Sequence, residues 1–162
     1  MLEQKLSDSK LTVIRTSRNN SGQIYDLEKR IFGANECFSR SQLRYLKSSP
    51  NVSFFLIRDH NSSIGFGVTL RNKLRNGKYK GRIYSIGVLP AYRSMGAGKF
   101  LLDAMEKYMI RSNVSFIVLE TLKGEGGAED FFARQGYVES KFLPDYYPYG
   151  DAVRMRKNVA TG

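Results

Sequence analysis

The sequence is poor in the residues that most often carry redox or nucleophilic chemistry. Its 162 residues include one cysteine, Cys37, one histidine, His60, and no tryptophan. A single cysteine excludes an internal disulfide, and the one histidine lies far from Cys37 in a turn-like Asp-His-Asn-Ser stretch. We therefore expect no cysteine–histidine nucleophile and no metal site.

Long apolar runs and acidic residues are also scarce. No segment approaches the roughly 18 consecutive apolar residues that span a bilayer, and residues 1–5 lack the apolar core of a secretion signal. These absences predict a cytoplasmic protein without membrane contact. Aspartate and glutamate number 15 against 26 lysines and arginines, which gives a formal charge of +11. This excess favours anionic partners, among them coenzymes, RNA, ribosomes and acidic membranes, without choosing between them.

The pattern of apolar residues predicts an α/β fold in a single domain covering residues 1–162. Strands are expected at residues 11–15, 52–58, 64–70, 82–88, 114–120, 136–142 and 151–157. Helices are expected at residues 24–31, 42–47, 100–109 and 128–134, and Ser39 is the expected N-cap of the second one. This order predicts a mixed, mostly antiparallel sheet of about seven strands flanked by about four helices, with at least one parallel crossover. A basic turn is expected at 71–81 and an aromatic loop at 144–149.

The most informative segment is the glycine-containing loop from Arg93 to Lys99, between a strand and an amphipathic helix. Gly96 and Gly98 allow backbone conformations that side chains forbid, and the following helix points the positive end of its dipole at the loop. This is the design of a pyrophosphate cradle. Two common nucleotide motifs are absent. A Walker-type loop needs Gly at 93 and Ser or Thr at 100, where this chain has Arg and Phe. The dinucleotide-binding fingerprint needs Gly at 101, where this chain has Leu. A tight strand-to-helix turn without a ligand is the alternative, and the flanking Arg93 and Lys99 favour the cradle.

Residues 83–102, IYSIGVLPAYRSMGAGKFLL, resemble the acetyl-coenzyme A motif of the GCN5-related N-acetyltransferase (GNAT) superfamily. Residues 119–120, 128, 132, 136–137 and 145–155 are similar to the branch that acetylates protein N-termini, especially the ribosomal-protein alanine N-acetyltransferases. The resemblance covers nearly the whole chain and implies a sheet that is splayed in the middle. It also implies an enzyme that transfers acetyl from acetyl-coenzyme A to a primary amine by direct attack, without an acyl-enzyme.

The resemblance also implies roles for particular residues. The backbone of Ile86, Gly87 and Val88 is expected to bind the pantetheine arm of the coenzyme. The pyrophosphate is expected at the backbone N–H groups of Arg93, Ser94, Met95, Gly96, Ala97 and Gly98, with Lys99 adding charge. Glu120, at the end of an apolar strand, matches the family's general base.

At two positions the chain departs from the family pattern. Phe132 stands where the family has a tyrosine that protonates the leaving thiolate, and Glu125 stands where it has an asparagine. Our candidate for the missing donor is Tyr137; water and the tyrosines at 146, 147 and 149 remain as alternatives. A thiol with a pKa near 8.5 also leaves moderately well as thiolate.

The acceptor is the least determined part of the prediction. An N-terminal amine has a pKa of about 7.7 to 8.0 and a lysine amine about 10.4, so a single carboxylate suits an N-terminus better. The alternatives are a small amine, such as a polyamine or an antibiotic, and a coenzyme-binding module without turnover. The resemblance places Tyr146 and Tyr147 at the border of the acceptor site, although a packed surface turn explains them equally well.

Two predictions about partners stay open. The six cations between residues 71 and 82 form either a docking segment for RNA or a ribosome, or a solvated hairpin. The chain is expected to be a monomer or a homodimer.

Overall fold

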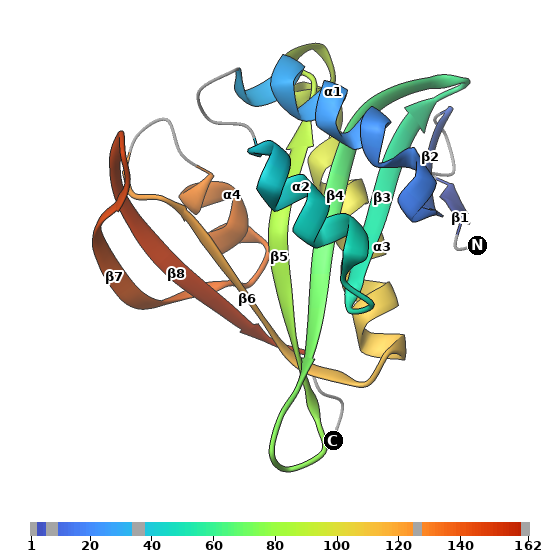
Figure 1. Ribbon diagram of the computed structural model, residues 1–162. Helices are drawn as coiled ribbons and strands as arrows, with labels where there is room; N and C mark the ends of the chain where they lie inside the picture. The colour runs from blue at the N-terminus through green and yellow to red at the C-terminus, as the bar shows by residue number, and fades with distance from the viewer. Residues whose placement is uncertain (1–2, 6–9, 34–37, 125–127, 160–162) are drawn as a thin grey trace.

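The computed structural model describes residues 3–5, 10–33, 38–124 and 128–159, and within them eight strands form one sheet (Figure 1). The strands are β1 (Glu3–Lys5), β2 (Leu11–Thr16), β3 (Val52–Asp59), β4 (Ser62–Lys73), β5 (Tyr79–Val88), β6 (Val114–Leu122), β7 (Val138–Tyr147) and β8 (Gly150–Asn158). The helices are α1 (Ser21–Phe32), α2 (Arg40–Ser48), α3 (Ala97–Arg111) and α4 (Glu129–Arg134), with 3₁₀ turns η1 (Arg18–Asn20) and η2 (Pro90–Met95). Cys37 and Glu125 lie outside the described residues.

The sheet order is β1-β2-β3-β4-β5-β6-β8-β7, and only β5 and β6 run parallel among these described strands. The predicted fold class is confirmed, because the expected strands and helices are all present in a mixed, mostly antiparallel sheet. The additional strand is the short β1 at the sheet edge. Within the described residues no helix is long and apolar enough to cross a bilayer.

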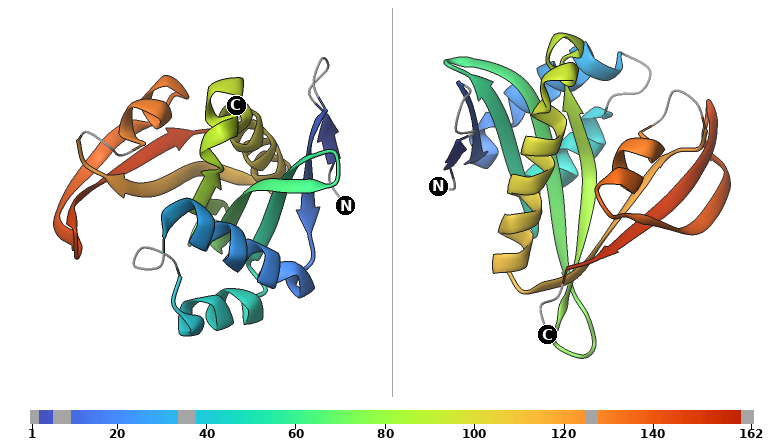
Figure 2. Two further views of the ribbon diagram at one scale, coloured as in Figure 1. Left: turned by 90° about the horizontal axis from the view of Figure 1, so that it is seen from above. Right: turned by 180° about the vertical axis from the view of Figure 1, so that it is seen from behind.

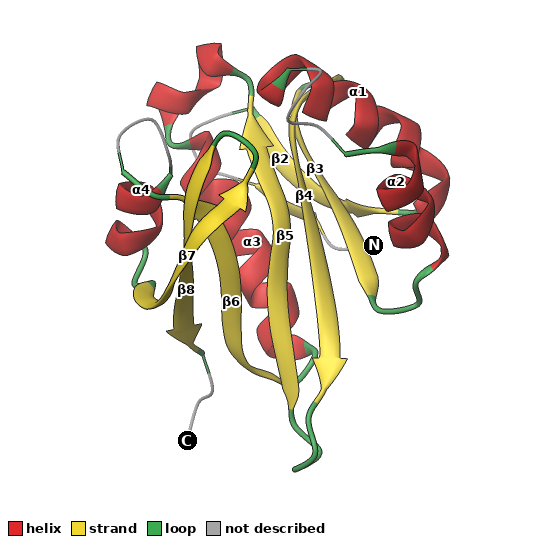
Figure 3. Ribbon diagram, turned by 60° about the vertical axis from the view of Figure 1, so that its left-hand side comes forward, coloured by secondary structure: helices red, strands yellow, loops and turns green. Residues whose placement is uncertain are grey.

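Helices cover the two faces of the sheet unequally. Helices α1 and α2 pack on one face of β3 and β4, while α3 and α4 lie on the opposite face (Figures 2 and 3). Residues 52–57 of β3 and 64–70 of β4 are therefore buried, and these two stretches are mostly apolar. On the side of α1 and α2, none of the described helices lies over strands β6, β7 and β8 (Figure 1).

The start of α2 is fixed by a capping box. The backbone N–H of Gln42 donates to the Ser39 hydroxyl at 3.1 Å, and the Ser39 N–H donates to the Gln42 side chain at 2.8 Å. This arrangement satisfies two N–H groups that a helix start otherwise leaves without partners. The N-cap predicted at Ser39 is confirmed.

Strands β5 and β6 pair only at one end, from Tyr79 opposite Val114 to Arg82 opposite Val118. Beyond these residues β5 pairs with β4 alone, and β6 pairs with β8 alone. The two strands therefore diverge as a fork, which Figure 1 shows as a V that opens away from the β4–β5 hairpin. The splay that the family resemblance implied is confirmed.

A β-bulge lies on β5 where the fork opens. Val68 pairs with Ser85 while Thr69 pairs with Ile83, so Tyr84 has no partner residue on β4. A bulge bends its strand and re-aims the side chains that follow it. It changes which face of the sheet each side chain from Tyr84 to Val88 points to.

The basic hairpin is longer than predicted. Residues 71–81 were expected to form a turn, but β4 continues to Lys73 and β5 begins at Tyr79, with the Leu74 N–H donating to the Lys78 carbonyl at 2.7 Å. The Arg71 guanidinium stacks on the Tyr79 ring at 4.2 Å, and it donates to the Ser112 carbonyl at 2.9 Å. Arg71 therefore has a structural role, and docking of RNA or a ribosome by this segment stays a prediction.

The prediction of an aromatic loop at residues 144–149 is wrong, because β7 continues through Tyr147. Pro144 suggests a break in the strand, yet β7 lies at the sheet edge, where a missing N–H costs no ladder hydrogen bond. The register is irregular between Leu143 and Tyr147, and Asp145 takes a φ of 53° there. Tyr146 and Tyr147 thus stand on a strand instead of a loop.

Glu28 is a buried carboxyl group between α1 and the start of α2. One oxygen accepts the Phe38 backbone N–H at 2.7 Å, and Oε2 is buried without a hydrogen-bond partner among the described residues. Burial raises the pKa of Glu28 to about 8, against the lowering effect of the Phe38 hydrogen bond. The folded protein therefore holds Glu28 in its neutral form at neutral pH.

This protonation makes stability depend on pH. Unfolded Glu28 ionises near pH 4.3, so from there to pH 8 the unfolded chain releases a proton that the folded chain keeps, and stability falls as pH rises. Glu28→Gln keeps an acceptor for Phe38 and cannot ionise. We expect thermal melts of Glu28→Gln and wild type to agree at pH 5, and the variant to be more stable at pH 8 by on the order of 2 kcal/mol.

The matched control is Asp26→Asn, which removes an exposed carboxylate from the same helix and leaves the pH dependence unchanged. Parallel stability curves for Glu28→Gln and wild type from pH 5 to pH 8 contradict the assignment.

Candidate active site

Glu120 lies just beyond the point where β5 and β6 separate. Its carboxylate, 7% exposed, forms an ion pair with the Arg82 guanidinium from β5, and Arg154 from β8 approaches it at 3.4 Å. The three residues come together because Arg82 precedes the fork and Glu120 pairs directly with Arg154. The two guanidinium groups fix the orientation of the carboxylate.

The pleat of β6 decides which side of the sheet Glu120 faces. Ile117 and Leu119 are buried in the core under α3, so Glu120, one residue further on, points to the opposite face. Helices α1 and α2 lie on this face, but they cover it only around β3 and β4. The carboxylate therefore lies on the open half of the sheet, beside the fork.

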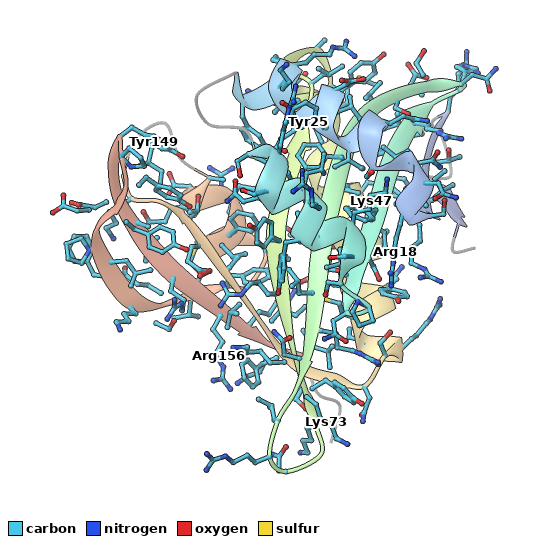
Figure 4. All side chains as sticks on the ribbon, viewed as in Figure 1. Arg18, Tyr25, Lys47, Lys73, Tyr149 and Arg156 are labelled. Carbon is cyan, nitrogen blue, oxygen red and sulfur yellow. The ribbon has the colours of Figure 1, made fainter. Side chains whose placement is uncertain are left out.

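Tyr147 is the tyrosine on β7 that the structure places within electrostatic range of Glu120. Burial raises the pKa of the Tyr147 hydroxyl, and the charges of Tyr149, Tyr146 and Glu120 raise it further. Its ring stacks on Tyr149, with 5.1 Å between the centroids. Figure 4 shows Tyr149 at the tip of the β7–β8 hairpin. Tyr147 is thus a protonated hydroxyl near the carboxylate throughout the neutral pH range.

Tyr84, which the sequence did not single out, joins the same group from β5. Burial raises the pKa of its hydroxyl, a hydrogen bond with Gln42 opposes the rise, and Tyr146 adds to it. Tyr84 therefore contacts α2 through Gln42 and lies within electrostatic range of Tyr146 on β7. Side chains alternate between the two faces of a strand, so its position two residues after Arg82 could have placed Tyr84 on the same face. The bulge at Tyr84 makes this inference from spacing unreliable.

Tyr137, the candidate proton donor, lies on the other face. Its hydroxyl donates to the buried Glu106 carboxylate at 2.9 Å, and Lys157 approaches the same carboxylate at 3.0 Å. Burial, followed by the Glu106 charge, raises the pKa of Tyr137. Tyr137 packs in the core under α3 with Phe132, so the structure does not bring it together with Glu120.

The glycine loop takes the form that a cradle needs. Arg93, Ser94 and Met95 lie in η2, and Gly96 then adopts a φ of 76° as the N-cap of α3. The first turn of α3 has no side-chain cap, so its N–H groups point out of the helix start without an intrahelical acceptor. These groups and the helix dipole offer a site for a phosphate.

The charged residues at the ends of this loop have contacts within the chain. The Nε of Arg93 donates to the Val88 carbonyl at 3.0 Å, which ties the loop back to the end of β5. The Lys99 ammonium donates to Asp103 at 3.1 Å on the surface of α3. Arg93 therefore positions the loop, while exposed Lys99 keeps access to solvent.

Residues Ile86, Gly87 and Val88 lie on the arm of β5 that has left β6. Their edge on the β6 side has no strand partner within the described part of the chain. A Cβ atom at Gly87 would approach Ile31 and Phe32 at 3.0 Å, so glycine lets α1 pack closely on β5. The free edge can form backbone hydrogen bonds with an extended ligand.

The fork thus connects two chemically different places. The phosphate cradle stands at the N-terminus of α3, and the carboxylate with its tyrosines stands on the opposite face. A long ligand with an anionic end can hold its phosphates at the cradle and extend through the fork along the free edge of β5. Its far end then meets Glu120.

Sequence comparison assigns the family. The profile of the Acetyltransferase (GNAT) family matches residues 22–137, and the chain belongs to this family. The matched range includes α1, the fork, the glycine loop and Glu120.

Two curated relatives are similar to part of the chain. An uncharacterized N-acetyltransferase of Methanocaldococcus jannaschii is 39% identical over 79 residues, which are 48% of this chain and 51% of the relative. An N-alpha-acetyltransferase of Sulfurisphaera tokodaii is 36% identical over 73 residues, 44% of each chain. The chain thus matches about half the length of these relatives or less.

Among solved structures, the fold is similar to the ribosomal-protein-S18-alanine N-acetyltransferase of Escherichia coli. The TM-score is 0.79, the sequence identity is 17%, and the match covers 94% of this chain and 96% of that one. At this identity the likeness shows the fold.

The cradle predicts a selective effect of Gly96→Val. The φ of 76° at Gly96 is strained for valine by about 1–2 kcal/mol, although no atom of the described residues lies within 4 Å of the added Cβ. Loss of the loop conformation turns N–H groups away from the phosphates. We expect calorimetry to show at least tenfold weaker binding of coenzyme A to a folded variant.

Gly77→Val is the control, because Gly77 has a φ of 84° and open space in the β4–β5 turn, far from the cradle. Equal affinities of both variants for coenzyme A would count against the cradle.

Proposed function

We propose that this chain, as a member of the GNAT family, transfers acetyl from acetyl-coenzyme A to the N-terminal amine of a polypeptide. The observation that carries the proposal is the fork between β5 and β6, which joins the phosphate cradle to the Glu120 carboxylate. The two relatives are named as N-acetyltransferases, one of them an N-alpha-acetyltransferase, and this supports the same reaction.

On the donor side, the chain supplies hydrogen bonds and position. The N–H groups from Arg93 to Gly98 would hold the pyrophosphate, and Lys99 would add positive charge. The free edge of β5 at Ile86, Gly87 and Val88 would bind the pantetheine arm, as one strand binds another. The acetyl thioester then reaches the face of the sheet where Glu120 stands.

On the acceptor side, the arginines favour a neutral amine. Arg82 and Arg154 offset the negative charge of Glu120, so the site does not stabilise an ammonium ion strongly. An N-terminal amine, with a pKa of about 7.7 to 8.0, is already partly neutral at physiological pH. The site suits this amine better than it suits lysine.

The reaction requires two proton movements. The amine nitrogen forms a bond to the acetyl carbon and releases a proton to Glu120, directly or through water, while the carbon–sulfur bond breaks and the thiolate leaves. Tyr147 is the hydroxyl that would protonate the thiolate, since it lies near Glu120 and stays protonated at neutral pH. We favour it over Tyr137, whose hydroxyl is bound to Glu106.

The charge of the acceptor face argues against a polyamine or a cationic antibiotic. Such substrates need several carboxylates around the acceptor, whereas Glu120 is surrounded by Arg82 and Arg154.

A coenzyme-binding module without turnover is the other alternative, because Phe132 cannot donate a proton.

A substrate panel tests the function. Thiol release from acetyl-coenzyme A is measured with free peptide N-termini, the same peptides blocked at the N-terminus but containing lysine, spermidine and an aminoglycoside. We expect turnover with free N-termini, and mass spectrometry to find the acetyl group on the α-amine. Faster transfer to spermidine or lysine contradicts the proposal, and coenzyme binding without transfer to any amine indicates the non-catalytic module.

Three substitutions test the assigned roles. We expect Glu120→Gln and Tyr147→Phe to lower kcat by about 100-fold, as loss of acid–base catalysis does, and Glu120→Gln to flatten the rising limb of the pH profile. Tyr137→Phe should leave kcat unchanged and reduce the free energy of unfolding by about 1 kcal/mol. A large fall in kcat for Tyr137→Phe, with full activity of Tyr147→Phe, reverses the assignment of the two tyrosines.

A further inference from the structure

The open half of the sheet, the face of β6, β7 and β8 turned away from α3, carries an excess of positive charge. Residues that share this face follow from the register, because Glu120 pairs with Arg154, and Val118 pairs with Arg156. On β7, Val138 pairs with Arg156 and Lys141 pairs with Arg154. At these positions the acidic residue is Glu120, and its charge is already compensated by arginine.

Arg156 is held ready for a ligand on this face. Its guanidinium lies over the Phe116 ring at 3.7 Å, and its Nε donates to Asn158 at 3.1 Å. Within the described residues, no carboxylate lies within ion-pair distance of it. The side chain therefore has a fixed plane and terminal N–H groups that can form two hydrogen bonds to one carboxylate. Figure 4 shows Arg156 on β8, toward the closed end of the fork.

Arg154 extends the same positive row toward Glu120. It pairs with Glu120 through one terminal nitrogen, and its Nε is buried without a hydrogen-bond partner among the described residues. Successive residues on one face of a strand are about 7 Å apart. Glu120, Arg154 and Arg156 therefore span the length of a few extended residues.

We propose that the acceptor polypeptide carries acidic side chains within its first few residues after the acetylated amine, and that Arg156 and Arg154 bind them. This inference rests on the proposed function. An amine at Glu120 places the side chains two to four residues downstream over Arg154 and Arg156, since an extended chain advances about 3.4 Å per residue. Basic residues at these positions are repelled by the same arginines and by Lys141.

The arrangement fits an acidic peptide better than a nucleic acid. The Phe116 ring, which could stack on a base, is covered by Arg156.

The test compares three N-terminal peptides of equal length, with aspartates, alanines or lysines at positions two to four. For the wild-type protein we expect kcat/KM to be at least tenfold higher for the aspartate peptide than for the lysine peptide, with the preference reduced in high salt. In Arg156→Glu the order of the two peptides should reverse, while the alanine peptide keeps its rate within about threefold.

Lys107→Glu is the matched control, because it makes the same charge change on the exposed side of α3, across the sheet. It should keep the wild-type preference. If the three peptides react equally, or if Lys107→Glu changes the preference as much as Arg156→Glu, the inference is wrong while the proposed function stands. If no peptide is acetylated, the proposed function fails, and the inference fails with it.

A binding measurement covers the remaining case. Fluorescence anisotropy with a single-stranded RNA should show no loss of affinity in Arg156→Glu beyond that in Lys107→Glu. A loss specific to Arg156→Glu, with no charge preference among the peptides, assigns the face to RNA and overturns the inference.

Discussion

The loss of pairing between β5 and β6 is the constraint on which the rest of the site depends. The ladder ends at Arg82 and Val118, and the next residue of β6 on the open face is Glu120. The ion pair of Arg82 with Glu120 therefore connects the two strands just where their backbones separate. Because Arg154 binds the same carboxylate from β8, one acidic side chain holds three strands at the closed end of the fork. Beyond the fork, the backbone groups of β5 on this side have no strand partner, so an extended ligand can form hydrogen bonds with them.

The fork also separates two electrostatic environments that one reaction needs together. The N-terminus of α3 offers N–H groups and a helix dipole to phosphates, whereas the other face offers a carboxylate balanced by guanidinium groups. If both lay on one face, the arginines would compete with the helix start for the phosphates. Under the proposed function, the sheet between them would keep the anionic coenzyme on the α3 side and leave the acceptor face free for an amine.

Much of this could be predicted from the sequence, because its local signals agree with the fold. Apolar runs predicted the strands, Ser39 predicted the start of α2, and Gly96 marked the loop that precedes α3. The extent of β7 could not be predicted, since Pro144 breaks a central strand but is tolerated at an edge, and edge position depends on the order of the whole sheet. Tyr84 was missed for a related reason: the bulge sets its direction, and a bulge arises from pairing with β4.

The position of the tyrosines shows why spacing alone does not identify a proton donor here. Tyr137 is close to Glu120 in sequence, yet it points into the core under α3, where Glu106 and Lys157 bind its hydroxyl and its ring. Phe132 packs against it in the same core, so this region of α4 contributes apolar surface and a buried hydrogen bond. Tyr147 is further along the chain, but β7 returns beside β8, and this brings its hydroxyl to the face of Glu120. Under the proposed function, the base Glu120 and the acid Tyr147 would lie on the same side of the fork, so the chain could lack a tyrosine at position 132 and still keep both groups.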